Sequence, residues 1–238
     1  MPAPTAVFTD LGTLDYHKAL DLQHKLVQGK IDGTITEDWI LLVEHPSVFT
    51  LGRRGGLENL LKSQDFLNQR DIAIVQTQRG GNITYHGPGQ IVVYPVFMLE
   101  HHHIGIKEFV YRLEEIMKQT AADSGITTDR NSKNPGLWAE CCKLGSVGLT
   151  VTHGVTMHGF ALNITVDLEP FSWINPCGLN DVGVTSIQNE LLRQGQDNPI
   201  SMETIKTNIV SHFLDLFKLG NIQCFHNAAG QDEAAFKI

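Results

Sequence analysis

Apolar side chains recur at intervals of three and four residues in four segments of this chain, a pattern typical of helices that bury one face. These segments are residues 16–29, 57–69, 107–124 and 201–219. Gly29, Gly125 and Gly220 close three of the patterns and predict where those helices end. Ser201 is placed to cap the start of the last helix.

Short, continuous apolar runs predict strands between these helices. The runs are Ile40–Val43, Val48–Leu51, Ile72–Val75, Ile91–Val96, Leu137–Ala139, Val147–Val151 and Gly159–Val166. They gather in the middle of the chain without a steady alternation of strand and helix, which favours an α/β fold of the α+β type, with helices packed on a mixed, largely antiparallel sheet. No proline- or serine-rich linker divides the chain, so we predict one domain over residues 1–238, with a poorly packed tail over residues 226–238.

Composition narrows the possible functions. The 238 residues are 42% hydrophobic and 18% charged, as in an ordinary globular protein, and the formal net charge of -8 argues against general binding to nucleic acid or to an acidic membrane surface. The longest apolar stretch, Ile91–Leu99, contains Pro95 and is too short to span a bilayer. The N-terminal residues lack a signal-peptide pattern, and four cysteines are too few for a disulfide framework, so we expect a cytoplasmic protein.

The most informative segment is residues 79–90, Arg-Gly-Gly-Asn-Ile-Thr-Tyr-His-Gly-Pro-Gly-Gln. Glycine gives up backbone entropy and buries no side chain, so we predict a loop here, held between two strands, where binding residues tend to lie. The alternative is a glycine-rich hairpin that binds nothing. The polar side chains of Arg79, Thr84, Tyr85 and His86 argue against that alternative.

Two further residues could carry chemistry. Cys177 stands between Pro176 and Gly178, in a turn that presents its thiol to a cavity or to solvent, whereas a structural cysteine usually lies among apolar neighbours. A reactive thiol needs a group that lowers its pKa. Lys143, at the start of the glycine-bearing segment 143–149, is the candidate for that group and for a proton carrier. The alternative for Lys143 is an ordinary surface lysine.

Three other groups of residues give weaker evidence of function. Three consecutive histidines, His101 to His103, cannot all face one ion from regular structure, so we predict a solvated loop and no metal site. Cys141 and Cys142 fit the end of a strand with alternating exposure. Arg53 and Arg54 make one loop basic in an otherwise acidic chain.

Four motifs occur in a fixed order along the chain. They are Arg79-Gly-Gly-x-x-Thr-Tyr-His-Gly-Pro-Gly-Gln90, Lys143-x-x-Ser-x-Gly148, His158-Gly-Phe-Ala-Leu-Asn163 and Asn175-Pro-Cys-Gly178. In these motifs the chain resembles the lipoyl(octanoyl) transferases, the octanoyl-acyl-carrier-protein–protein N-octanoyltransferases of lipoate biosynthesis. The resemblance extends upstream to residues 42–46 and 49–53, and the chain departs from the family chiefly at Cys141-Cys142.

The resemblance implies the biotin/lipoate protein ligase fold and an acyltransferase activity. An octanoyl group would pass from octanoyl-acyl carrier protein to a lysine of lipoyl domains, in 2-oxoacid dehydrogenase complexes and in the glycine cleavage H protein. It also implies an acyl-thioester intermediate on Cys177, with Lys143 lowering the pKa of that thiol. The donor is already a thioester, so no ATP or other cofactor is expected.

The resemblance also places the substrate contacts. They are Arg79, Gly80, Gly81, Asn82, Ile83, Thr84, Tyr85, His86, Ser146, Val147, Gly148, Gly159, Phe160 and Ala161. Acyl carrier proteins are acidic, and so is this chain, so we expect a local basic patch to bind the carrier. The candidates for this patch are Arg53, Arg54, Lys62, Arg70 and Arg79.

Three alternatives stay open at this point. An ATP-dependent lipoate–protein ligase has the same implied fold, but its glycine loop normally carries an aspartate after the histidine, where this chain has Gly87-Pro88. A ligase also has no need of a nucleophile such as Cys177. A catalytically silent acyl- or lipoyl-binding protein and a thiol hydrolase that releases octanoate are the other two.

Overall fold

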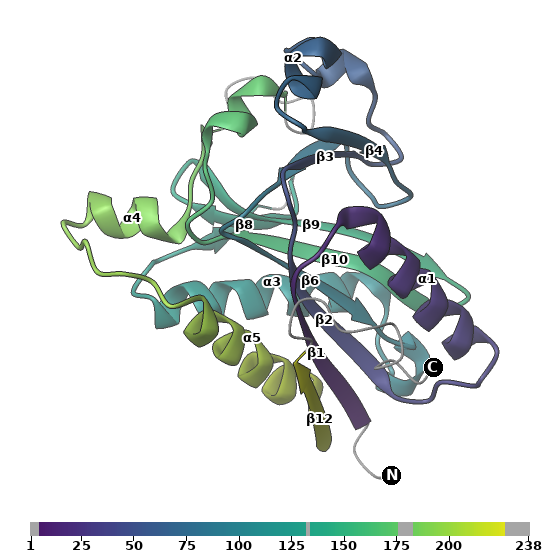
Figure 1. The fold of residues 1–238 in the computed structure, drawn as a ribbon. Coiled ribbons are helices and arrows are strands. Elements are labelled where there is room, and N and C mark those ends of the chain that lie inside the picture. The colour runs from purple at the N-terminus through teal and green to yellow at the C-terminus, as the bar shows by residue number, and fades with distance from the viewer. Residues whose placement is uncertain (1–4, 132–133, 176–182, 227–238) are drawn as a thin grey trace.

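A large mixed sheet forms the centre of the molecule in the computed structural model, which describes residues 5–131, 134–175 and 183–226 (Figure 1). Its strands are β1 (Thr5–Thr13), β2 (Asp38–Glu44), β6 (Gln90–Val96), β7 (Asp129–Arg130), β8 (Gly136–Ala139), β9 (Cys142–Thr152), β10 (Val155–Asn163), β11 (Gly183–Val184) and β12 (Asn221–His226). They lie in the order β12-β1-β2-β6-β10-β9-β8-β7, and β11 pairs with β9. Pairing is antiparallel from β2 through β7 and parallel at β1 with β2 and β12 and at β11 with β9, which confirms the mixed, largely antiparallel sheet.

Helices cover both faces of this sheet. They are α1 (Tyr16–Ile31), α2 (Gln64–Asn68), α3 (Ile106–Asp123), α4 (Ile187–Arg193) and α5 (Met202–Phe217), with short 3-10 turns η1 (Leu57–Asn59), η2 (Leu99–His102) and η3 (Glu169–Trp173). One core, with Phe109, Phe160 and Phe213, joins the sheet to α3 and α5, and a second, with Leu26 and Val92, joins it to α1. None of the helices in the described part of the chain has the length and apolar character needed to cross a bilayer.

The predicted helix over residues 57–69 is wrong, although the other three helical segments are confirmed within a few residues. This segment divides into η1 and α2 because the chain between them pairs elsewhere. Leu60 forms an antiparallel bridge with Ile174, and the Leu61 N–H donates to the Trp173 carbonyl at 2.8 Å. The predicted cap of the last helix is confirmed, since Ser201 Oγ accepts from the Thr204 N–H.

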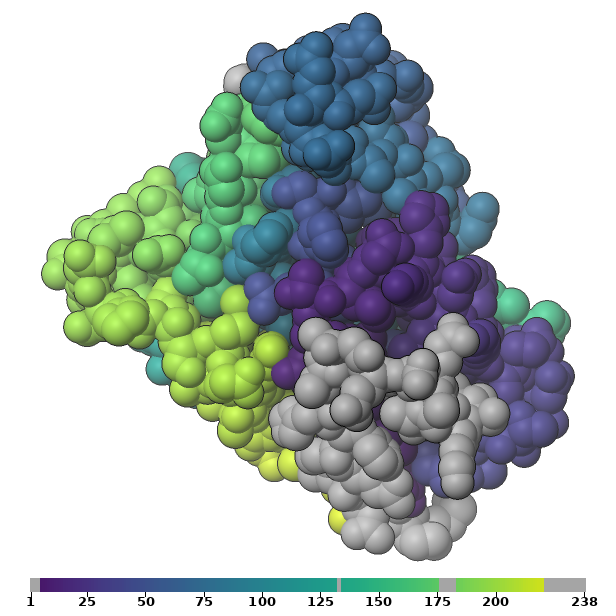
Figure 2. All heavy atoms as spheres, viewed as in Figure 1, coloured from purple at the N-terminus to yellow at the C-terminus, as the bar shows by residue number. Residues whose placement is uncertain are grey.

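A second, small sheet carries part of the glycine-rich segment. It consists of β4 (Ala73–Gln76), β3 (Val48–Leu51) and β5 (Ile83–His86), and with α2 it forms the blue projection at the top of Figure 2. The prediction that residues 79–90 form a loop throughout is therefore wrong at β5. Its Ile-Thr-Tyr-His sequence has β-branched and aromatic side chains, which favour a strand, and it pairs antiparallel with β3.

His101 and His103 are exposed, as predicted, but the prediction of a solvated loop is wrong at His102. His102 ends η2, and its buried ring bonds the carboxylate of Asp38 through Nε2. The other carboxylate oxygen of Asp38 lies 2.9 Å from Lys30 Nζ, which also donates to the Glu37 carbonyl. Lys30, Asp38 and His102 thus form a buried charge cluster that ties α1, β2 and η2 together.

Candidate active site

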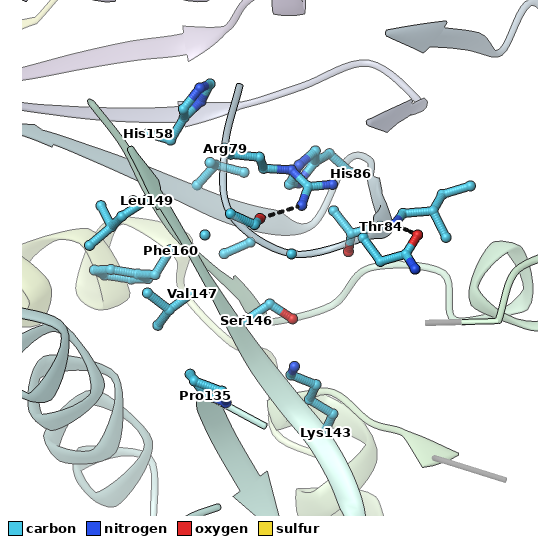
Figure 3. Close-up of a pocket in the computed structure, with 18 of the residues that line it drawn as sticks. Arg79, Thr84, His86, Pro135, Lys143, Ser146, Val147, Leu149, His158 and Phe160 are labelled. Carbon is cyan, nitrogen blue, oxygen red and sulfur yellow. Dashed lines mark hydrogen bonds between the residues drawn. The ribbon is translucent and has the colours of Figure 1, made fainter. Parts of the chain in front are cut away.

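A cavity of about 320 Å³ opens where the glycine-rich segment crosses β9 and β10 (Figure 3), within the size range of small-molecule sites. Lys143 lines it together with most of the predicted substrate contacts. Those contacts are Arg79, Gly80, Gly81, Asn82, Ile83, Thr84, His86, Ser146, Val147, Gly148, Gly159, Phe160 and Ala161. Cys177, the predicted nucleophile, lies outside the described residues.

Strand register brings the separate motifs together. Gly148 of β9 pairs with Gly159 of β10, so the second and third motifs face each other across one antiparallel ladder. The Gly80 N–H donates to the Leu149 carbonyl at 2.9 Å, which adds the first motif. A Cβ at Gly159 would lie 2.0 Å from the Val93 carbonyl oxygen, so only glycine allows this approach.

Tyr85 is the one predicted substrate contact that does not line the cavity. Side chains alternate along a strand, and Tyr85 points away from the face that Thr84 and His86 present. Its hydroxyl lies 2.9 Å from Ser47 Oγ, and its ring packs against Phe49 with the ring centres 5.2 Å apart. Burial raises the pKa of Tyr85. In this structure Tyr85 is part of the core beneath the small sheet.

Lys143 is not a surface residue, because only 7% of it is exposed. Its Nζ donates to Asn134 Oδ1 at 2.8 Å and lies 5.6 Å from the centre of the Trp138 ring. Its backbone carbonyl accepts from the Thr185 N–H at 3.0 Å, next to the pairing of β11 with β9. The lysine that the sequence singled out is therefore held at both its backbone and its side chain.

Arg79 is buried and fixed to the neighbouring strand, so its candidacy for an exposed docking patch is wrong. Only 8% of the residue is exposed, and Nη2 donates to the Thr50 carbonyl at 2.6 Å. Nε and Nη2 also donate to Thr50 Oγ1. With its acceptor lone pairs taken, Thr50 Oγ1 is left to donate toward His86 Nε2, 3.4 Å away.

A chain of buried polar side chains runs from this arginine to Lys143. His86 Nδ1 donates to Gln90 Oε1 at 2.6 Å, and Gln90 Nε2 donates to Asn163 Oδ1 at 2.8 Å. Asn163 Nδ2 then donates to the Thr185 carbonyl at 2.9 Å, and the Thr185 N–H bonds Lys143. Gln90 and Asn163 end two of the sequence motifs, but nothing in the sequence showed that their side chains bond each other.

Burial keeps the imidazoles at this end of the cavity neutral. It lowers the pKa of His86 and of His158 to about 3 and the pKa of neighbouring His45 to about 4. It raises the pKa of Tyr16, whose ring stacks on His86, to about 12. These groups hold fixed protonation states across the neutral pH range, so the wall acts as a set of neutral dipoles around the Arg79 charge.

Mostly apolar side chains line the part of the cavity between Lys143 and Arg79. Figure 3 shows Ser146, Val147 and Leu149 of β9 between Lys143 and Arg79, with Phe160 beside them. Val110 of α3 completes this part of the wall. The sequence predicted α3 only as a packing helix, because its helical pattern does not show which turn meets a cavity.

Exposed cations stand at the rim. Arg53 and Arg54 are exposed, and their backbone N–H groups donate to the carbonyls of Arg79 and Gly81 at 2.9 and 3.2 Å. Arg54 also lines the cavity. The loop that carries both arginines is thus fixed to the glycine-rich segment by its backbone, which leaves their charged groups in solvent.

Comparisons with known proteins agree with this geometry. Residues 15–214 match the family model of the lipoyl protein ligase A/B catalytic domain. The octanoyltransferase of Desulfotalea psychrophila is 44% identical over 210 residues, which are 87% of this chain and 92% of that protein. The octanoyltransferase of Alkaliphilus metalliredigens is 40% identical over 90% of this chain and 96% of its own length.

Solved structures support the fold at much lower identity. A lipoate protein ligase from T. acidophilum with bound lipoic acid superposes with a TM-score of 0.70 at 12% identity, covering 96% of this chain and 91% of its own. Lipoate-protein ligase A bound with ATP gives 0.69 at 11% identity, covering 96% and 90%. These matches confirm the predicted lipoate ligase-like fold.

Proposed function

Because the chain belongs to the lipoyl protein ligase A/B catalytic-domain family and, within it, to the octanoyltransferases, we propose a specific acyl transfer. The donor is octanoyl-acyl carrier protein, and the acceptor is a lysine of a lipoyl domain. The octanoyl group passes through a thioester on Cys177. The acceptors are the lipoyl domains of 2-oxoacid dehydrogenase complexes and the glycine cleavage H protein. A cytoplasmic setting suits a chain in which Cys141 and Cys142 are thiols.

The observation that carries the proposal is a buried lysine at one end of an apolar-walled cavity. Lys143 lines this cavity, and Val147 and Phe160 extend the wall away from it. Such a wall suits an acyl chain, since burying each methylene contributes about 0.8 kcal/mol. A reacting carbonyl beside Lys143 would then have its hydrocarbon tail along β9 and β10.

The proposed reaction has two steps. The Cys177 thiol gives its proton to Lys143, and the sulfur attacks the thioester carbonyl carbon, forming a new C–S bond as the bond to the carrier sulfur breaks. The carrier sulfur leaves as a thiolate and takes the proton back from Lys143, so the carrier thiol is released and the lysine is neutral again. The acceptor amine next attacks the enzyme thioester, a C–N bond replaces the C–S bond, and Lys143 takes the amine proton. Because the acyl group stays on the enzyme between steps, donor and acceptor need not bind together.

Intact mass spectrometry tests the covalent step. The purified protein is mixed with octanoyl-acyl carrier protein, without ATP and without acceptor, beside Cys177→Ala and Lys143→Ala. One octanoyl adduct on the wild type, absent from Cys177→Ala and slow to form on Lys143→Ala, is the expected result. No adduct on the wild type, with amide still forming once a lipoyl domain is added, would contradict the thioester on Cys177.

A second pair of reactions separates transfer from ligation. Free octanoate with ATP replaces the acyl carrier substrate, with the same lipoyl domain as acceptor. We expect no amide product, because the donor in the proposed reaction is already activated. Amide formed only in the presence of ATP would assign the chain a ligase activity instead.

A further inference from the structure

Residues 134–138, which lead into β8 and form most of it, pack around the side chain of Lys143. Asn134 supplies the oxygen that accepts from Lys143 Nζ at 2.8 Å, and only 8% of Asn134 is exposed. The Trp138 ring, four residues later, lies beside the same Nζ. Trp138 Nε1 in turn donates to the Asn134 carbonyl at 3.2 Å, so the two groups that contact the lysine also hold each other.

Gly136, between them, makes room for the lysine stem. Its φ of +136° is disfavoured for other residues, and a Cβ there would lie 2.9 Å from Lys143 Cε and 2.3 Å from the Gly145 carbonyl oxygen. Its N–H donates to Glu114 Oε1 on α3 at 2.8 Å, which anchors the turn to the core. The backbone of this segment is thus shaped to pack against Lys143.

We infer that Asn134 is a positioning residue for the transfer reaction, holding the Lys143 amine through a neutral acceptor so that its proton stays transferable. The inference rests on the proposed role of Lys143. An amide oxygen accepts a hydrogen bond from either the ammonium or the neutral amine, so it fixes the direction of Nζ in both states. A carboxylate in its place would favour the charged form alone, because opposite charges at this distance stabilise each other.

Other groups around Lys143 bear on its charge. Among the residues that the structure describes, titratable and charged side chains on the surrounding elements include Glu114, Arg130, Cys142, Arg193, Arg54, Arg79 and His86. The Glu114 carboxylate is itself engaged, by the Gly136 N–H and by Arg130 at 3.5 Å. These groups are the same in every Asn134 variant. A change in the pH midpoint of Lys143 in such a variant therefore reports the effect of the substituted side chain.

The test compares three substitutions of Asn134 over a range of pH. Asn134→Asp introduces a carboxylate at the same distance, and we expect the pH at which transfer reaches half its maximum to rise by about one unit or more. At pH 7 this lowers the rate by about tenfold. Asn134→Leu removes the acceptor, so kcat falls while KM for the acyl carrier substrate stays the same and the pH midpoint does not rise. Asn134→Gln keeps an amide oxygen and restores part of the kcat lost in Asn134→Leu.

Asn198→Asp is the matched control, because Asn198 is exposed, does not line the cavity and undergoes the same charge change. Its pH profile should match that of the wild type. Thermal melting confirms that each variant is folded. If the pH profile of transfer in Asn134→Asp coincides with that of the control, the inference is overturned. It is also overturned if kcat falls equally in all three Asn134 variants while their pH profiles stay unchanged. Either result would leave Asn134 with a packing role only.

A direct titration separates this inference from the proposed function. Protein labelled with 13Cε-lysine gives an NMR signal for Lys143, assigned by its loss in Lys143→Arg, and no substrate is needed. We expect the midpoint of that signal to move to higher pH in Asn134→Asp. An unmoved midpoint refutes the inference even if the wild type transfers octanoate. A wild type that neither takes up nor transfers octanoate refutes the proposed function, whatever the NMR shows.

Discussion

Two buried lysines in this molecule are satisfied in different ways. Lys30, 4% exposed, faces the carboxylate of Asp38 at 2.9 Å and lies among packed helices and strands away from the cavity. Lys143, 7% exposed, donates from Nζ to the neutral amide of Asn134. A carboxylate stabilises the ammonium form of its partner and makes the proton hard to remove. An amide holds the nitrogen in place without that preference, which suits the proton transfer that we propose for Lys143.

The same contrast extends to the residues around each lysine. The Lys30 region pairs opposite charges and adds His102 to them. The cavity region instead links Gln90 and Asn163 through neutral hydrogen bonds and keeps its imidazoles uncharged. Ion pairing therefore holds the Lys30 region together, whereas hydrogen bonds between neutral side chains hold this part of the cavity wall together.

The contrast is tested most strongly at Lys143 itself. Lys143→Met keeps the length of the side chain and removes the amine, so we expect a folded protein whose transfer rate falls by about a hundredfold to ten-thousandfold. The measurement is single-turnover transfer of octanoate to a lipoyl domain, with thermal melting as the folding control. A fall in the transfer rate of less than about threefold would mean that Lys143, like Lys30, has only a structural role.

Lys30→Met should have the opposite effects: a less stable fold and an unchanged transfer rate. It leaves the Asp38 carboxylate buried without its ammonium partner, and we expect the free energy of unfolding to fall by about 3–5 kcal/mol. Transfer per folded molecule should not change. Urea unfolding measures the first quantity and initial rates the second. The double variant Lys30→Met/Asp38→Leu should regain part of the lost stability, because it removes the unpaired charge as well.

The polar chain of the cavity is tested next at Asn163. Asn163→Leu leaves Gln90 Nε2 and the Thr185 carbonyl without this partner, at a cost of about 2 kcal/mol in unfolding free energy. Transfer should also slow, because the Thr185 N–H that holds the Lys143 backbone depends on this chain. Asn163→Asp keeps the shape and serves as the comparison. Full stability in Asn163→Leu would show that the chain adds nothing to the fold.

The neutral imidazoles predict a dependence of stability on pH. Burial lowers the pKa of His158 from 6.5 to about 3 in the folded protein, so between these values only the unfolded chain binds the proton. The stability contributed by neutral His158 is therefore complete above pH 6.5 and is lost as the pH falls toward 3. We expect His158→Phe to reduce the slope of unfolding free energy between pH 6 and 4 by about 1.4 kcal/mol per pH unit. An identical slope in urea titrations of both proteins contradicts the neutral state of this ring.

The smallest effect is expected at the exposed cations of the rim. Reversing Arg53 and Arg54 to Glu should raise KM for the acyl carrier protein several-fold and weaken its dependence on salt, because these side chains are exposed and screened. The turnover of a small octanoyl thioester, which needs no protein docking, should not change. If KM for the carrier is also unchanged, these two arginines are not part of the docking surface.

Much of the fold followed from the sequence because helical and strand periodicities are local. The helix α3 and the strands β3 and β6 were predicted within one residue of their observed limits, whereas the run predicted over residues 159–166 is displaced by three to four residues from β10. No strand was predicted at β1 or β12, and no helix at α4. The errors over residues 57–69 and at β5 depend on partners far along the chain. Residues 57–69 lose their helix to pairing with Ile174, and β5 forms within a glycine-rich segment because β3 lies beside it.

The candidate site also divides into features that the sequence predicts and features that depend on contacts between distant residues. The motifs identified Lys143, and every predicted substrate contact except Tyr85 lines the cavity. Tyr85 lies outside the cavity lining, which the motif could not show because a motif does not reveal strand alternation. The burial of Arg79 depends on Thr50 in another strand. Asn134 carried no signal at all, since it reaches Lys143 only after β8 and β9 fold back on each other.

The position of β1 has a consequence for how the chain is made. This first strand lies between β2 and β12, parallel to both, and its partner β12 is residues 221–226. During synthesis on the ribosome, β1 can pair with β2 early, but its other edge stays open until residues 221–226 have emerged. An open strand edge is a template for pairing with other chains. Pairing with β12, the last strand of the described residues, therefore also protects β1 from aggregation.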